Sequence, residues 1–126
     1  MNIPADLKYT KDHEWLKIDG DIATIGVTDF AQKELGDIVF VEVDTEGETL
    51  GLGDVFGTVE AVKTVSDLFM PLAGTVDSIN ESLEDTPEVV NQDPYGEGWM
   101  VKIKFDAGAD ISELLSAEQY KEVIGE

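Results

Sequence analysis

The chain has 126 residues, enough for one domain with a hydrophobic core, and we expect a single domain over residues 1–126. Asp and Glu number 28 against 8 basic residues, all of them lysine, for a formal net charge of −20. Such a surface repels nucleic acids and anionic membranes, so neither is an expected partner. The sequence has no cysteine, which excludes disulfides, thiolate nucleophiles and cysteine metal sites. Any redox chemistry must therefore come from an attached or bound group.

No apolar run in the sequence approaches the length that a membrane-spanning helix needs. The first residues, 1–6, lack the apolar core of a signal peptide and the arginine-rich character of a transit peptide. We therefore expect a cytoplasmic protein.

The N-terminal third predicts a β-hairpin followed by a short helix. Asp19-Gly20 is a two-residue hairpin signal, because both central positions of such a turn need a positive φ. Thr28 or Asp29 can cap a helix and Gly36 can end it in a left-handed conformation. The expected elements are strands at 16–18, 21–26 and 38–43 and a helix at 30–35.

Residues 55–70 are rich in valine, threonine and phenylalanine and by pattern alone would form one continuous strand. That length exceeds the usual five or six residues and indicates a break without locating it. Ser116 and Gln119 fit a capping box near the C-terminus. Many short strands with little helix predict a small β-sandwich or barrel. The remaining expected elements are strands at 75–79 and 99–105, a polar loop at 80–93 and a helix at 110–124.

Lys63 is the only basic residue between Lys33 and Lys102. Lysine is almost never fully buried unless it is paired, so we expect the chain to bend at Lys63 and expose it. From spacing alone the commonest explanation is a solvated surface lysine, which also discourages pairing at a sheet edge.

The residues around Lys63 fit the pattern G-x-V-E-x-V-K-x-x-x-D-x-x-x-P-x-x-G-x-V. This segment resembles the attachment hairpin of the glycine cleavage H-protein family, and further matches in order run from about Leu7 to Ile124. The resemblance implies lipoate in amide linkage on Lys63, in a hairpin over about residues 55–70. It also implies a flattened two-sheet sandwich of the barrel-sandwich-hybrid, lipoyl/biotinyl-domain type, with a short internal helix and a C-terminal helix. The matching residues are Gly57, Val59, Glu60, Val62, Lys63, Asp67, Pro71, Gly74 and Val76.

The resemblance further implies a carrier, not an enzyme. The lipoyl arm would accept an aminomethyl group from glycine decarboxylase (P protein) and present it to the aminomethyltransferase (T protein). Dihydrolipoamide dehydrogenase (L protein) would then reoxidise the arm. An unmodified lysine is almost entirely protonated at pH 7, so its acylation needs an activating enzyme, a lipoate ligase or a lipoyl/octanoyl transferase. By covalent geometry the dithiolane would lie on the order of 14 Å from the backbone.

Three carboxylates are candidate contacts for the arm or for the lipoylating enzyme. Glu14 and Asp67 are candidates to line a resting groove, since a carboxylate can bind a cationic aminomethyl group. Glu60 is a candidate for recognition by the lipoylating enzyme. Plain solvated carboxylates are the alternative for all three. His13 is the only histidine and has no second ligand at metal-site spacing, so we expect a structural role.

Several alternatives remain open at this point. Biotin carriers typically place methionines beside the lysine, whereas Val62 and Thr64 flank it here. Lipoyl domains of 2-oxo acid dehydrogenases usually have D-K-A at the site, within longer chains. Two further alternatives are a lipoyl-relay role, in which the protein hands lipoate on to other carriers, and a purely structural acidic β-domain. The structural alternative predicts that Lys63 stays unmodified.

Overall fold

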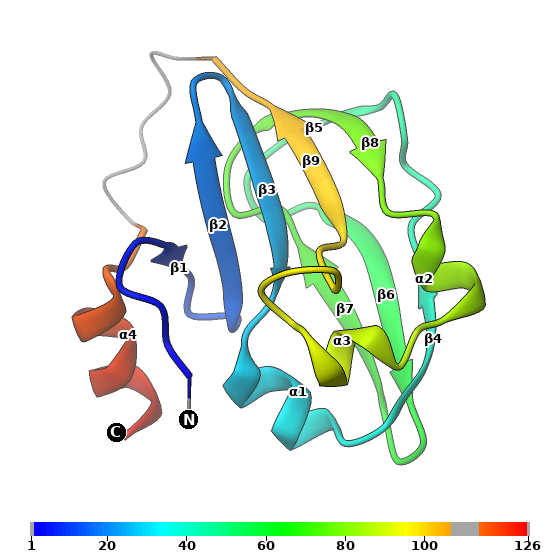
Figure 1. Cartoon of the computed structure of the whole chain (residues 1–126). Helices are drawn as coiled ribbons and strands as arrows, with labels where there is room; N and C mark the ends of the chain where they lie inside the picture. Colours follow the sequence, from blue (N-terminus) through cyan, green and yellow to red (C-terminus); the bar gives the residue numbers. More distant parts are fainter. Residues whose placement is uncertain (1, 107–113, 126) are drawn as a thin grey trace.

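The computed structural model describes residues 2–106 and 114–125 and arranges them as two antiparallel sheets (Figure 1). One sheet has six strands in the order β1-β2-β3-β9-β8-β5, and the other has three in the order β4-β6-β7. This confirms the expected mainly β, two-sheet architecture. The strands are β1 (Lys8–Tyr9), β2 (Glu14–Asp19), β3 (Ile22–Val27), β4 (Ile38–Glu42), β5 (Thr49–Leu50), β6 (Val55–Ala61), β7 (Val65–Phe69), β8 (Gly74–Ile79) and β9 (Val101–Lys104).

The main core lies between the two sheets. Alternation along each strand turns every second side chain inward, so apolar residues of both sheets meet there. Each such aliphatic side chain stabilises the fold by about 1.5–3 kcal/mol relative to an exposed one. A smaller cluster, which includes Tyr9, Trp15 and Tyr120, packs at the β1 edge. Fully buried members of the main core include Leu16, Ile25, Val59, Val76, Val101 and Ile103.

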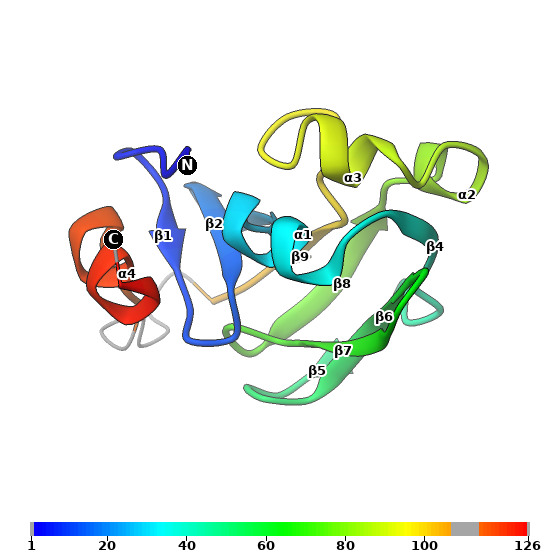
Figure 2. The same cartoon turned by 90° about the horizontal axis from the view of Figure 1, so that it is seen from below.

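Helix α1 (Asp29–Leu35) forms where the sequence predicts it. The hydroxyl of Thr28 accepts a hydrogen bond from the Ala31 backbone N–H at 3.1 Å, which caps the first turn. Gly36 ends the helix as expected, with a positive φ of 81°, but its ψ of −157° is extended and not left-handed helical. Figure 2 shows α1 on the same side of β6 and β7 as the short helices α2 (Ser82–Asp85) and α3 (Val89–Gln92).

The C-terminal helix α4 (Ala117–Ile124) begins later than the sequence predicts. Ser116 and Gln119 form the expected capping box, and Ser116 therefore marks the helix start. Leu115 precedes it in a bridge to Tyr9, which holds the backbone extended, so the expected helix is wrong at residues 114–116. The expected residues 110–113 lie outside the described part. Helix α4 lies beyond β1, at the edge of the six-stranded sheet (Figures 1 and 2).

The expected polar loop at 80–93 is also wrong in part, because it contains α2 and α3. Each helix is a single turn anchored by one buried residue, Leu83 in α2 and Val90 in α3. The predicted strand at 99–105 is shorter, since β9 covers only its central residues. None of the helices described is long and apolar enough to cross a membrane.

Candidate functional site

Lys63 lies at the tip of the hairpin formed by β6 and β7. The last pair of the ladder joins Glu60 to Val65, and the chain reverses through Val62, Lys63 and Thr64, which are all exposed. The Ala61 N–H donates to the Thr64 carbonyl oxygen at 2.8 Å and closes the turn. The hairpin reaches the lower end of the molecule in Figure 1. The expected bend at Lys63 is therefore present in the structure.

The tip is held by the segment that follows α1. The Val62 N–H donates to the Asp37 carbonyl oxygen at 3.0 Å. Beside this bond, the Lys63 side chain passes over Gly36, where a Cβ atom would lie 3.4 Å from Lys63 Cε. Within the described part of the chain, no acceptor lies within hydrogen-bond or ion-pair distance of Lys63 Nζ. The amine is thus exposed and unpaired, while its aliphatic stem has a defined neighbour.

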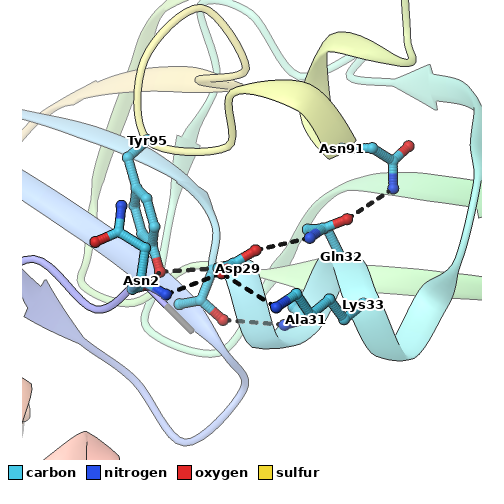
Figure 3. Close-up of polar contacts among 8 residues, drawn as sticks. Asn2, Asp29, Ala31, Gln32, Lys33, Asn91 and Tyr95 are labelled. Carbon is cyan, nitrogen blue, oxygen red and sulfur yellow. Dashed lines mark hydrogen bonds and ion pairs between the residues drawn. The ribbon is translucent and has the colours of Figure 1, made fainter.

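Asn91 of α3 fixes the segment that supports the tip. Its Oδ1 accepts from the Ile38 N–H at 2.8 Å, and its Nδ2 donates to the Gly36 carbonyl oxygen at 2.9 Å. Nδ2 also lies 3.0 Å from Gln32 Oε1, to which it donates (Figure 3). The family resemblance includes Asn91 but gives it no role. One side chain therefore satisfies two backbone groups on either side of Asp37.

The same chain of polar contacts continues to the start of α1. Gln32 Nε2 donates to Asp29 Oδ1 at 2.7 Å, and Asp29 Oδ2 accepts from the Asn2 N–H at 3.0 Å (Figure 3). The Asp29 N–H donates to the Tyr95 hydroxyl at 3.0 Å. Although burial of Asp29 raises its pKa, the hydrogen bonds from Asn2 and Gln32 and the Lys33 charge outweigh it and leave the pKa lowered. Both ends of α1 are thus fixed by side chains remote in sequence.

A cavity of about 140 Å³ lies between α1 and the β6–β7 hairpin. Strand alternation places Ser66 on the inner face with Leu68 and Val59, whereas the exposed Asp67 reaches the cavity at its rim. The apolar lining residues are Val27, Ala31, Leu35, Val59 and Leu68, and the polar ones are Asp12, His13, Glu34, Ser66 and Asp67. Such a cavity suits a ligand with an apolar body and a cationic end.

Glu14 is buried and does not line this cavity. Its Oε2 accepts a hydrogen bond from the Phe69 N–H at 2.9 Å, and its Oε1 accepts one from the Thr10 hydroxyl at 3.4 Å. Burial raises the pKa of Glu14 to about 8, although the Phe69 bond acts in the opposite direction. The structure therefore brings Asp67 to the cavity, whereas Glu14 is buried and is not among the lining residues. Glu60 lies on the opposite, outer face of β6 and is exposed.

His13 borders the cavity, which its position in the sequence did not predict. The backbone of His13 has a φ of 65°. Its Nδ1 lies 2.9 Å from the Tyr120 hydroxyl, and its ring packs against the Phe30 ring with centroids 4.8 Å apart. Burial lowers the pKa of His13, so the neutral imidazole is favoured. Among residues 2–106 and 114–125, no group of three His, Asp or Glu side chains is placed to hold a metal ion.

Comparison with known proteins agrees with this geometry. The family model described as "Glycine cleavage H-protein" matches residues 7–126. The chain belongs to the glycine cleavage H-protein family. Members of this family are the lipoyl-carrying shuttle of the glycine cleavage system.

Individual H proteins are similar over almost the whole chain. The glycine cleavage system H protein of Chlorobium limicola is 62% identical to this chain, and the match covers 100% of each of the two proteins. That of Bacteroides fragilis is 58% identical over 98% of both chains. A crystal structure of the H protein from Mycobacterium marinum is similar with a TM-score of 0.90 and 38% identity, covering 98% of this chain and 100% of that one.

Proposed function

We propose that Lys63 carries lipoate in amide linkage and that the chain shuttles the loaded arm between partner enzymes without catalysing a reaction itself. The proposed partners are glycine decarboxylase, the aminomethyltransferase and dihydrolipoamide dehydrogenase. The observation that carries the proposal is the position of Lys63, whose amine is exposed at a hairpin tip and has no partner among residues 2–106 and 114–125. When bound, the lipoyl group would supply the two dithiolane sulfurs, one of which can bond to the aminomethyl group as the S–S bond opens.

The residues near the tip fit such an arm. Amide formation removes the lysine charge, and the aliphatic stem of Lys63 passes close to Gly36. The cavity beside α1 offers an apolar floor of Val59 and Leu68. We propose that this cavity is the resting groove of the arm and that Asp67, at its rim, binds the cationic amine. Glu14 would act indirectly, by holding the Phe69 N–H at the end of β7.

The test is the intact mass of the protein from its native cell, followed by peptide fragmentation. We expect one lipoyl group, located on Lys63. A matched pair of variants, Lys63→Arg and Lys33→Arg, should separate this site from another exposed lysine: only the first should abolish the adduct. A biotinyl adduct on Lys63 would move the chain to the carboxylase carriers. An unmodified Lys63 in cells with working lipoylation would overturn the shuttle role.

A further inference from the structure

Three of the eight lysines lie on the outer face of the six-stranded sheet. Alternate residues of β2 and β9, such as Leu16 and Ile103, point into the main core. Lys17, Lys102 and Lys104 therefore point away from it. We name this surface the lysine face and define it by Lys104 and by one row across four strands. In that row each residue pairs with the next, in the order Lys17, Thr24, Lys102 and Ser78.

The lysine face is open to solvent. In Figure 1 it is turned toward the viewer, and no helix of the described chain crosses the upper halves of β2, β3 and β9. Lys17 and Lys104 are exposed, and Lys102 is half-buried. Because neighbouring strands lie about 4.8 Å apart, the Cα atoms of Lys17 and Lys102 are about 10 Å apart. Those of Lys102 and Lys104, two residues along one strand, are about 7 Å apart.

Within residues 2–106 and 114–125, the lysines of this face form no ion pair, although the chain has 28 acids. Thr24 lies between Lys17 and Lys102 in the row, and Ser78 lies on the other side of Lys102. An acid at either position would form a stabilising cross-strand pair with a lysine. The exposed acids on these strands are Asp19 of β2 and Asp77 of β8. The row itself therefore presents only ammonium and hydroxyl groups, which can all donate to an anion.

Trp99 holds the central lysine of the face. Lys102 Nζ lies 5.0 Å from the centre of the Trp99 ring, which is a cation–π distance. The ring restricts an otherwise flexible side chain, so less rotamer freedom is lost when Lys102 binds an anion. An ammonium above a ring still has N–H groups that can donate to a carboxylate. Lys102 is thus already positioned for an anionic partner.

We propose that the lysine face binds a carboxylate-rich segment of the enzyme that loads the lipoyl arm. The inference rests on the proposed shuttle function, in which glycine decarboxylase is that enzyme. Carboxylate oxygens accept charge-assisted hydrogen bonds from the lysines and ordinary ones from Thr24 and Ser78. A nucleic acid or an anionic membrane would also face the acids on the rest of the surface, and the net charge of −20 repels such extended polyanions. A short acidic segment contacts the lysine face alone.

The position of the lysine face leaves the arm free. Figures 1 and 2 show β6 and β7, which carry Lys63 at their tip, on the far side of the core from β2 and β9. No residue of the lysine face lines the cavity beside α1. A segment bound to the lysine face therefore holds the body of the chain without covering Lys63 or the cavity.

The charge of the arm favours the loading enzyme as the partner. Amide formation removes the Lys63 charge and an oxidised dithiolane has none, so the unloaded arm offers no charge for long-range attraction. The aminomethyltransferase receives a cationic arm, which does. Glycine decarboxylase must in addition hold glycine until the neutral arm arrives, and binding of the body raises the effective concentration of the arm at its active site. Such binding lowers KM for the shuttle and leaves kcat unchanged.

The test removes two exposed lysines from the face and two from elsewhere. Lys17→Gln/Lys104→Gln leaves the contact of Lys102 with Trp99 intact, and Lys8→Gln/Lys121→Gln makes the same change in charge at exposed positions outside the face. With lipoylated protein and purified glycine decarboxylase, we expect KM for the shuttle to rise about tenfold for the face variant and by less than about twofold for the control. At high salt the KM of the wild type should approach that of the face variant, because screening weakens the contacts.

Each result has a defined meaning. Thermal melts identify an unfolded variant, and Lys17→Gln alone then carries the comparison. An unchanged KM for the folded face variant, or an equal rise for the control, would overturn the docking surface and leave the shuttle function intact. An equal rise with the aminomethyltransferase or dihydrolipoamide dehydrogenase would overturn the assignment to the loading enzyme. Failure of glycine decarboxylase to load the lipoylated wild type would instead overturn the proposed function.

Discussion

The hydroxyl of Tyr120 lies 2.7 Å from Thr28 Oγ1, and thereby joins α4 to the N-cap of α1. The same hydroxyl lies 2.9 Å from His13 Nδ1. Tyr120 is fully buried and stacks on Tyr9 with ring centroids 4.8 Å apart. One side chain of the C-terminal helix thus fixes both a cavity residue and the helix that forms one cavity wall.

Tyr120→Phe should therefore destabilise the protein by about 1–3 kcal/mol, because His13 Nδ1 and the Thr28 hydroxyl both lose their bond to Tyr120, and the Thr28 hydroxyl keeps only the Ala31 N–H. The free energy of unfolding from urea titration measures this. Tyr95→Phe is the matched control: the Tyr95 hydroxyl also makes two bonds, but it donates to the exposed Asn2 carbonyl, where water can replace it. A loss for Tyr95→Phe equal to or larger than that for Tyr120→Phe would contradict this view of the Tyr120 hydroxyl.

Asn91→Ala should destabilise the protein by about 2–4 kcal/mol, since the Ile38 N–H and the Gly36 carbonyl lose their partner together. The Val62 N–H bonds to the adjacent Asp37 carbonyl, so its hydrogen exchange should also accelerate. NMR-detected amide exchange in D2O measures the protection of the Val62 N–H, and the slowest-exchanging amides report the free energy of unfolding. Gln92→Ala, at the exposed next position, should change neither. Unchanged protection of Val62 in Asn91→Ala would show that the tip does not depend on Asn91.

The strands and α1 were predictable because their signals are local. The Thr28 cap acts through neighbouring residues and occurs as expected. The hairpin turn expected at Asp19-Gly20 is wrong by one residue: Asp19 pairs with Ile22 as the last residue of β2, so the turn consists of Gly20 and Asp21, and only Gly20 has a positive φ. The bend at Lys63 was not predictable from the pattern, because residues 61–64 contain no standard turn former. A long-range bond from Val62 to Asp37 holds it, so the isolated charge of Lys63 and the family resemblance located it, and no turn motif did. Helices α2 and α3 have four residues each, too few to display helical periodicity.

The same distinction applies to the site. Lys63 could be singled out by its isolation among acids, whereas the cavity combines residues from β3, α1, the His13 loop and both hairpin strands. Glu14 was a candidate groove residue because a carboxylate can bind the cationic amine of a loaded arm. Its burial depends on the Phe69 N–H, 55 residues away in sequence, which no local pattern reveals.

Glu14→Gln should alter the pH dependence of stability. The folded state holds the Glu14 proton up to a pKa of about 8, whereas the unfolded chain releases it near 4.5. Between these values the unfolded state binds fewer protons, so the wild-type stability falls as the pH rises, and the loss is complete above about pH 8. The amide of the variant does not titrate, so the advantage of Glu14→Gln over the wild type should grow by a few kcal/mol from pH 5 to pH 8.

Urea titrations of Glu14→Gln and the wild type at pH 5, 6.5 and 8 test this prediction. Glu60→Gln, at an exposed position on the outer face, is the control and should show no comparable change with pH. If the difference between Glu14→Gln and the wild type stays constant across this range, Glu14 is already ionised in the folded protein.

Gly36→Ala should disturb the site through the backbone. Gly36 has φ 81° and ψ −157°, a region that is essentially limited to glycine, so any side chain there costs about 1–3 kcal/mol. Its new Cβ would also lie 3.4 Å from Lys63 Cε. The control is Gly20→Ala, at φ 63° with no neighbouring atom within 4 Å, where only left-handed strain of about 1–2 kcal/mol applies. Gly36→Ala should slow acylation of Lys63 in the folded protein, and Gly20→Ala should not. Equal acylation rates for the two variants would mean that the backbone conformation at Gly36 does not position Lys63 for acylation.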